Sequence, residues 1–126
     1  LAEFKNDVIY FKGFNLFINL KEANILTDSK KFSDAVDASI AIFEKIRTET
    51  SLTIVTDGPN IACGVSNEGV AKVQPEVIRG TASRLGAGDA FFAYFLSYKE
   101  LNPSASLKKS LYAANRKTQN YLKAND

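Results

Sequence analysis

Short runs of apolar and β-branched residues recur along the chain, separated by polar breaks. Runs of roughly four to eight such residues are typical of buried strands. The runs at 14–19, 52–56, 61–65 and 70–73 therefore predict strands. Only residues 66–69, with the sequence Ser-Asn-Glu-Gly, separate the last two runs, and this spacing predicts a β-hairpin.

The segments between and after these runs have helical spacing. From Phe32 onward the apolar residues fall three or four positions apart, which predicts a helix over 32–47. A shorter helix is expected at 21–26, directly after the first strand. A third is expected to begin near Asp89 and to end before Pro103, and Ser104 and Ser106 are candidate N-caps for a last helix.

The order of these elements indicates an α/β fold. Strand, helix and strand, followed by a hairpin and two helices, predict a mostly parallel, Rossmann-like sheet with helices on its faces. With 126 residues the chain is long enough to bury one substantial core, so we expect a single domain over 1–126.

The composition excludes several classes of function. The net charge is +2, with no basic excess that would favour a nucleic-acid partner. The chain has no histidine and one cysteine, Cys63, which excludes imidazole catalysis and nearly all zinc sites. No apolar run approaches the ~20 residues of a membrane span. We therefore expect a cytoplasmic protein without a membrane partner. Because the chain also lacks methionine, we expect it to be a segment of something longer.

The strongest chemical signal is the sequence Gly86-Ala87-Gly88-Asp89 before an apolar helix. Glycines allow tight turns and close approach of a ligand to the backbone. The first amides of a helix have no partner inside it and readily bind a phosphate. These residues therefore predict an anion site with a carboxylate beside it. The alternative is an ordinary glycine loop in which Asp89 is only an N-terminal helix acid.

Two further groups of polar residues follow predicted strands. Asn19 and Glu22 lie three positions apart after the first strand, a spacing that also fits a capping box. Thr56, Gly58 and Asn60 follow the second strand, where a simple turn is the alternative interpretation. Ligands of open α/β sheets gather at the carboxyl ends of strands, so both groups are candidate site residues.

Taken together, these segments resemble the ribokinase-like carbohydrate kinases of the phosphofructokinase B family. The matching segments are 19–23, 56–60 and 86–91, in the order of the family, and Ala114-Asn115 resembles a helix segment that lies near adenine there. Members of the family are considerably longer. The resemblance therefore implies the C-terminal, nucleotide-binding portion of a ribokinase-like fold.

The resemblance also implies an activity, namely ATP-dependent phosphoryl transfer to the hydroxyl of a sugar or nucleoside. Asp89 would accept the proton of the attacking hydroxyl, and the backbone of Gly86, Ala87 and Gly88 would hold the phosphoryl oxygens. The remaining residues would bind the cofactors ATP and Mg²⁺: Thr56, Gly58, Asn60 and Asn115 the nucleotide, and Asn19 and Glu22 the metal, through water.

Some positions depart from the pattern of the family. Ser83-Arg84 stands where Asp-Thr is usual, and Ile61 and Tyr94 replace residues that are usually small. These departures support a second hypothesis, a catalytically degenerate domain that binds a nucleotide or a partner without turnover. A third is that the segment alone is inactive. In that case we expect a free sheet edge and, with it, a homodimer or aggregation.

Overall fold

The sheet of this computed structural model has four strands in the order β1-β2-β3-β4. The structure describes residues 15–27, 31–46, 51–75 and 87–124. The strands are β1 (Leu16–Asn19), β2 (Leu52–Asp57), β3 (Asn60–Ser66) and β4 (Gly69–Val73). β1 and β2 are parallel, whereas β3 pairs antiparallel with both β2 and β4. Because the 57–60 turn sends the chain straight back along β2, the described part of the sheet is mixed rather than mostly parallel as predicted.

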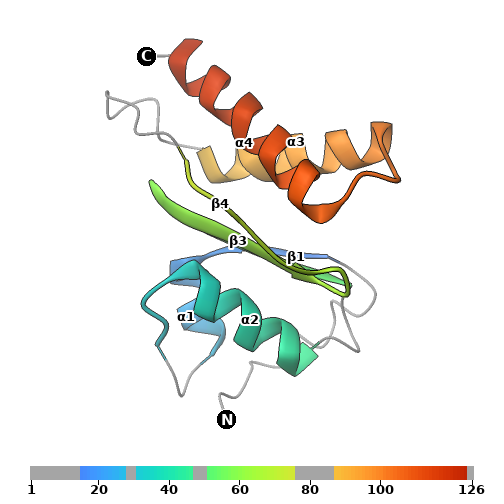
Figure 1. The fold of residues 1–126 in the computed structure, drawn as a ribbon. Coiled ribbons are helices and arrows are strands. Elements are labelled where there is room, and N and C mark those ends of the chain that lie inside the picture. Colours follow the sequence, from blue (N-terminus) through green and yellow to red (C-terminus); the bar gives the residue numbers. More distant parts are fainter. Residues whose placement is uncertain (1–14, 28–30, 47–50, 76–86, 125–126) are drawn as a thin grey trace.

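Helices cover both faces of this sheet (Figure 1). On one face lie α1 (Leu20–Leu26) and α2 (Ala35–Ile46), and on the other lie α3 (Ala87–Leu101) and α4 (Leu107–Ala124). Each face has its own apolar core. Ile42 and Phe43 of α2 belong to one core, and Phe95 and Leu111 of α3 and α4 belong to the other. The predicted α/β layers and the hairpin are therefore confirmed.

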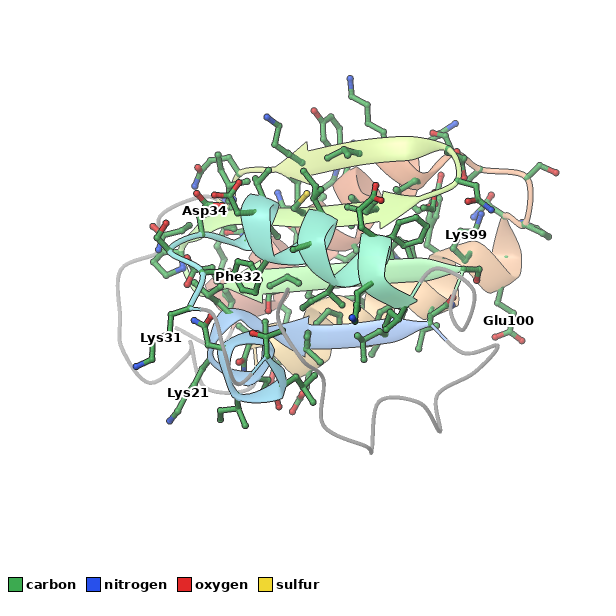
Figure 2. The ribbon with its side chains drawn as sticks, turned by 90° about the horizontal axis from the view of Figure 1, so that it is seen from below. Lys21, Lys31, Phe32, Asp34, Lys99 and Glu100 are labelled. Carbon is green, nitrogen blue, oxygen red and sulfur yellow. The ribbon has the colours of Figure 1, made fainter. Side chains whose placement is uncertain are left out.

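The helix α2 begins three residues later than its hydrophobic pattern predicts. Asp34 caps it, since its Oδ1 accepts a hydrogen bond from the amide of Asp37 at 2.8 Å. Phe32 precedes the helix and is held by Asn24 of α1, whose side chain accepts from the Phe32 amide at 2.6 Å and donates to its carbonyl at 3.1 Å. Figure 2 shows Phe32 beside α1, at the entry to α2.

Contacts from outside the helix fix the start of α4. Ser106, one of the two predicted caps, accepts a hydrogen bond from the amide of Lys109 at 3.1 Å. The first turn of α4 has no acidic residue of its own. Glu68, in the hairpin turn, supplies a carboxylate there and accepts from the amide of Leu107 at 3.2 Å. A negative charge at this end of a helix is favourable.

A close approach between β3 and α4 sets the position of α4. A Cβ atom added at Gly64 would lie 3.2 Å from Leu111 Cδ1 and 3.3 Å from Leu107 Cδ1. Only a residue without a side chain lets the helix pack this closely on the strand. None of the helices in the described ranges is long and apolar enough to cross a bilayer.

Candidate functional site

Thr56, at the end of β2, is the point on which the three sequence motifs converge. The parallel register pairs it with Asn19, at the end of β1. From the other side of the sheet, α3 brings Gly88 so close that an added Cβ would lie 3.9 Å from Thr56 Oγ1. Residues that are far apart in the sequence therefore meet at the carboxyl ends of the two parallel strands, where α/β folds bind ligands.

A cavity of about 150 Å³ opens beside Thr56, between the sheet and the helices α3 and α4. An apolar cavity of this size accommodates one small ring compound. Its polar groups are few and lie among apolar ones, as is common in small-molecule sites. The lining residues come from the end of β2, the hairpin, α3 and α4: Thr56, Gly58, Pro59, Ala62, Pro75, Ala87, Gly88, Phe91, Asn115, Thr118, Gln119 and Leu122.

The N-terminus of α3 forms one wall of this cavity. The helix begins at Ala87, two residues before the predicted start, so that Ala87 and Gly88 are its first residues. Their amides have no partner inside the helix, and the helix dipole makes this end partly positive. Asp89 lies in the same turn with an exposed side chain. The remaining predicted residue, Gly86, lies outside the described residues, as do Ser83 and Arg84.

Asn19 and Glu22 form the capping box at the start of α1. Asn19 Oδ1 accepts from the amide of Glu22 at 2.7 Å, and Glu22 Oε1 accepts from the amide of Asn19 at 2.9 Å. Both residues are exposed. The box engages one oxygen of the Glu22 carboxylate, and Mg²⁺ keeps several waters and needs few protein ligands. The pair therefore fits a water-bridged Mg²⁺, although the described residues contain no cluster of three His, Cys, Asp or Glu that could hold a metal.

The turn between β2 and β3 contributes Gly58 and Pro59 to the cavity. Gly58 has a φ of 55°, a left-handed conformation that favours glycine. Asn60 is exposed and does not line the cavity; its Nδ2 donates to Asp57 Oδ2 at 3.2 Å across the turn. The structure thus brings Gly58 to the cavity and places the side chain of Asn60 in the turn itself.

Asn115 lies on α4 and lines the same cavity. Gln119, one helical turn further on, was not among the predicted site residues. It lines the same cavity, is only 7% exposed, and its Nε2 lies 3.5 Å from Asn115 Oδ1. Residues four apart share a helix face, so the position of Asn115 was the signal that could have found Gln119.

A comparison with known protein families shows the family to which the chain belongs. The model of the pfkB family carbohydrate kinases matches residues 14–117. The chain therefore belongs to this family, as its motifs predict. A search of curated protein sequences found no match.

Solved structures of the same fold are similar to this chain. Phosphofructokinase-2 from Escherichia coli, in complex with substrates and products, superposes with a TM-score of 0.68 and 22% identity over 92% of this chain. The apo adenosine kinase of Trypanosoma brucei brucei gives a TM-score of 0.66 with 16% identity over 84% of the chain. A putative ribokinase II from E. coli, in complex with ATP and Mg²⁺, gives 0.60 with 22% identity over 82%.

The chain spans only part of these proteins. It covers 41% of the phosphofructokinase-2 chain, 34% of the adenosine kinase and 32% of the ribokinase. At these identities the likeness establishes a ribokinase-like fold, in partial form.

Proposed function

We propose that the protein carrying this chain is an ATP-dependent phosphotransferase that acts on the hydroxyl of a sugar or nucleoside. The observation that supports this most is the convergence on Thr56. The parallel register brings Asn19 to it, and the packing of α3 brings Gly88 to it. The cavity then continues from this point to Asn115 on α4.

The start of α3 is suited to the transferred phosphoryl group. Phosphoryl transfer relies mainly on positioning and on neutralising charge. In the proposal, the amides at Gly86, Ala87 and Gly88 bind the phosphoryl oxygens, aided by the helix dipole. Asp89 takes the proton of the attacking hydroxyl as its oxygen bonds to the γ-phosphorus. The bond from that phosphorus to the bridging oxygen breaks, and the leaving diphosphate keeps its electron pair.

The other polar residues take supporting roles. The cavity accepts the base, between the Gly58-Pro59 turn and Asn115. Asn60 orders that turn through Asp57. Glu22, with Asn19 fixed beside it, holds the waters of Mg²⁺. Bound there, Mg²⁺ would neutralise phosphate charge.

The test is Asp89→Asn in the full-length protein, assayed for phosphoryl transfer to a panel of sugars and nucleosides. Removing a general base typically lowers the rate by about 10²- to 10⁴-fold. Binding of ATP·Mg²⁺ should persist, because the backbone anion site remains. The matched control is Glu100→Gln in the last turn of α3, whose exposed side chain extends outward from the body of the molecule (Figure 2).

The outcomes separate the hypotheses. A near wild-type rate for Asp89→Asn would overturn the role of Asp89. A wild-type protein that binds ATP·Mg²⁺ but phosphorylates nothing on the panel would favour the non-catalytic nucleotide-binding domain. Failure to bind any nucleotide would overturn both.

A further inference from the structure

Gln119 stands out among the buried polar side chains of the described residues. Only two buried side-chain polar atoms there lack a hydrogen-bond partner, namely Thr53 Oγ1 and Gln119 Oε1. Such atoms are rare in folded proteins and call for an explanation. Thr53 lies inside β2 away from the cavity, whereas Gln119 lines the cavity. Of the two, Gln119 is therefore the one that a ligand can satisfy.

The contact with Asn115 determines which atom of the Gln119 amide has no hydrogen-bond partner. Gln119 Nε2 lies 3.5 Å from Asn115 Oδ1 and is the donor of that pair. Turning the Gln119 amide alone would set two oxygens against each other. The pair therefore leaves the acceptor Oε1 available, and a matching ligand must bring an N–H donor.

We propose that Gln119 is a base-specificity residue, which accepts a hydrogen bond from the exocyclic amine of a 6-aminopurine. This inference rests on the proposed function, since it takes the cavity to be the base site. Gln119 Oε1 is shielded from solvent. Because the contact with Asn115 fixes which end of the amide is the acceptor, the Gln119 and Asn115 side chains must shift together, with this contact kept, for Oε1 to meet the ligand.

A 6-oxopurine would be rejected at the same position. It presents a carbonyl oxygen where the 6-aminopurine presents a donor, so two acceptors would meet and Gln119 Oε1 would stay unsatisfied. Because Gln119 Oε1 has no partner in the free chain either, the discrimination comes from the hydrogen bond that a 6-aminopurine gains there and from the repulsion between two acceptors when a 6-oxopurine binds. We expect ATP to bind about tenfold more tightly than ITP.

The experiment compares the binding of ATP, ITP and purine riboside triphosphate, each with Mg²⁺, to the full-length protein by calorimetry. Purine riboside triphosphate lacks any substituent at carbon 6 and should bind between the other two. Gln119→Leu should reduce the preference for ATP over ITP to within about twofold. Asn120→Leu, one residue along α4 and absent from the cavity lining, should keep it.

Each outcome of this experiment either supports or overturns the inference about Gln119. Equal binding of ATP and ITP to the wild type, or a preference that survives Gln119→Leu, overturns the inference while leaving nucleotide binding intact. Tighter binding of ITP would mean that the amides of Gln119 and Asn115 both have the opposite orientation, so that Gln119 offers its N–H group. That result would overturn the proposed recognition of an exocyclic amine. Absence of binding for all three nucleotides overturns the proposed function itself. If Gln119→Leu does not fold, the order of the three nucleotides on the wild type still decides.

Discussion

Cys63 illustrates how burial sets the chemistry of a single residue. It is fully buried on β3, in the core between the sheet and the helices α1 and α2. Burial raises the pKa of its thiol above the ordinary value, because the thiolate loses solvation there, while Ser39 lowers it to a smaller extent. The thiol therefore stays protonated and unreactive in the folded chain.

The first prediction concerns the reactivity of this thiol. Iodoacetamide should modify Cys63 more than about tenfold more slowly in the native protein than in urea, because reaction requires opening of the core. The matching pH effect follows from the raised pKa. The contribution of the thiol to stability is fully present below the pKa of the unfolded chain and is lost as the pH rises through the folded value.

Urea unfolding at neutral and alkaline pH measures this effect, with Cys63→Ala as the control for all other titrating groups. The wild type should lose more unfolding free energy than Cys63→Ala as the pH rises. Equal losses in the two proteins, or rapid native alkylation, would contradict the prediction.

At the scale of the elements, two glycines have opposite structural roles. Gly64 is where α4 touches the sheet, and a methyl group there would lie 3.2–3.4 Å from the side chains of Leu111, Leu107 and Ile54. Gly88 has one neighbour near its added methyl, Thr56 Oγ1 at 3.9 Å, which is an ordinary contact. One glycine therefore serves packing, whereas the other keeps the site open.

The second prediction is that alanine at Gly64 lowers stability, whereas alanine at Gly88 weakens ligand binding. Gly64→Ala should lower the unfolding free energy by about 1–3 kcal/mol, as overpacking does. Gly88→Ala should leave it unchanged or raise it by up to about 1 kcal/mol, since alanine favours helices. It should nevertheless weaken nucleotide binding roughly tenfold or more, because its methyl enters the site beside Thr56.

Urea titrations and nucleotide calorimetry on both variants check this, and each glycine is the control for the other. A Gly88→Ala protein that binds nucleotide as tightly as the wild type would show that the start of α3 lies away from the ligand.

Helix starts were harder to predict than strands because different forces fix them. The β-branched run at 52–56 coincides with most of β2, since a short run of strand-forming residues that is buried throughout decides a strand locally. The start of α2 depends on the Asp34 cap and on the contact of Phe32 with Asn24. The hydrophobic pattern contains neither contact, and by itself it would include Phe32 in the helix.

At the scale of the whole molecule, sequence order predicted the convergence of the motifs but not the full lining of the cavity. Residues at the ends of parallel strands meet by topology, so the adjacency of Asn19 and Thr56 followed from recognising β1 and β2 as strands. Gln119 could not be found that way. Its spacing from Asn115 on the helix was a signal in the sequence, but its place in the cavity lining depends on how α4 lies on β3 at Gly64.

The β4 edge of the sheet, one of its two edges among the described strands, is the other feature that belongs to the whole molecule. Within the described residues, β4 pairs only with β3, so its outer edge has no partner strand. Exposed apolar side chains lie on the same hairpin, where Val70 is 50% and Ile61 40% exposed. An edge with unpaired backbone groups and apolar side chains favours pairing with a second copy.

The third prediction is therefore that the 126-residue chain, expressed alone, self-associates through β4. Light scattering should show an average mass that rises with protein concentration. Val70→Lys should weaken this association, because a lysine on an edge strand opposes pairing. The control is Leu96→Lys on α3, which replaces a side chain of similar exposure (48%) away from the sheet edge and should leave the association unchanged. A monomer at all concentrations would contradict the prediction. Equal weakening of the association by Val70→Lys and Leu96→Lys would contradict an interface at the sheet edge and would indicate that the helices take part.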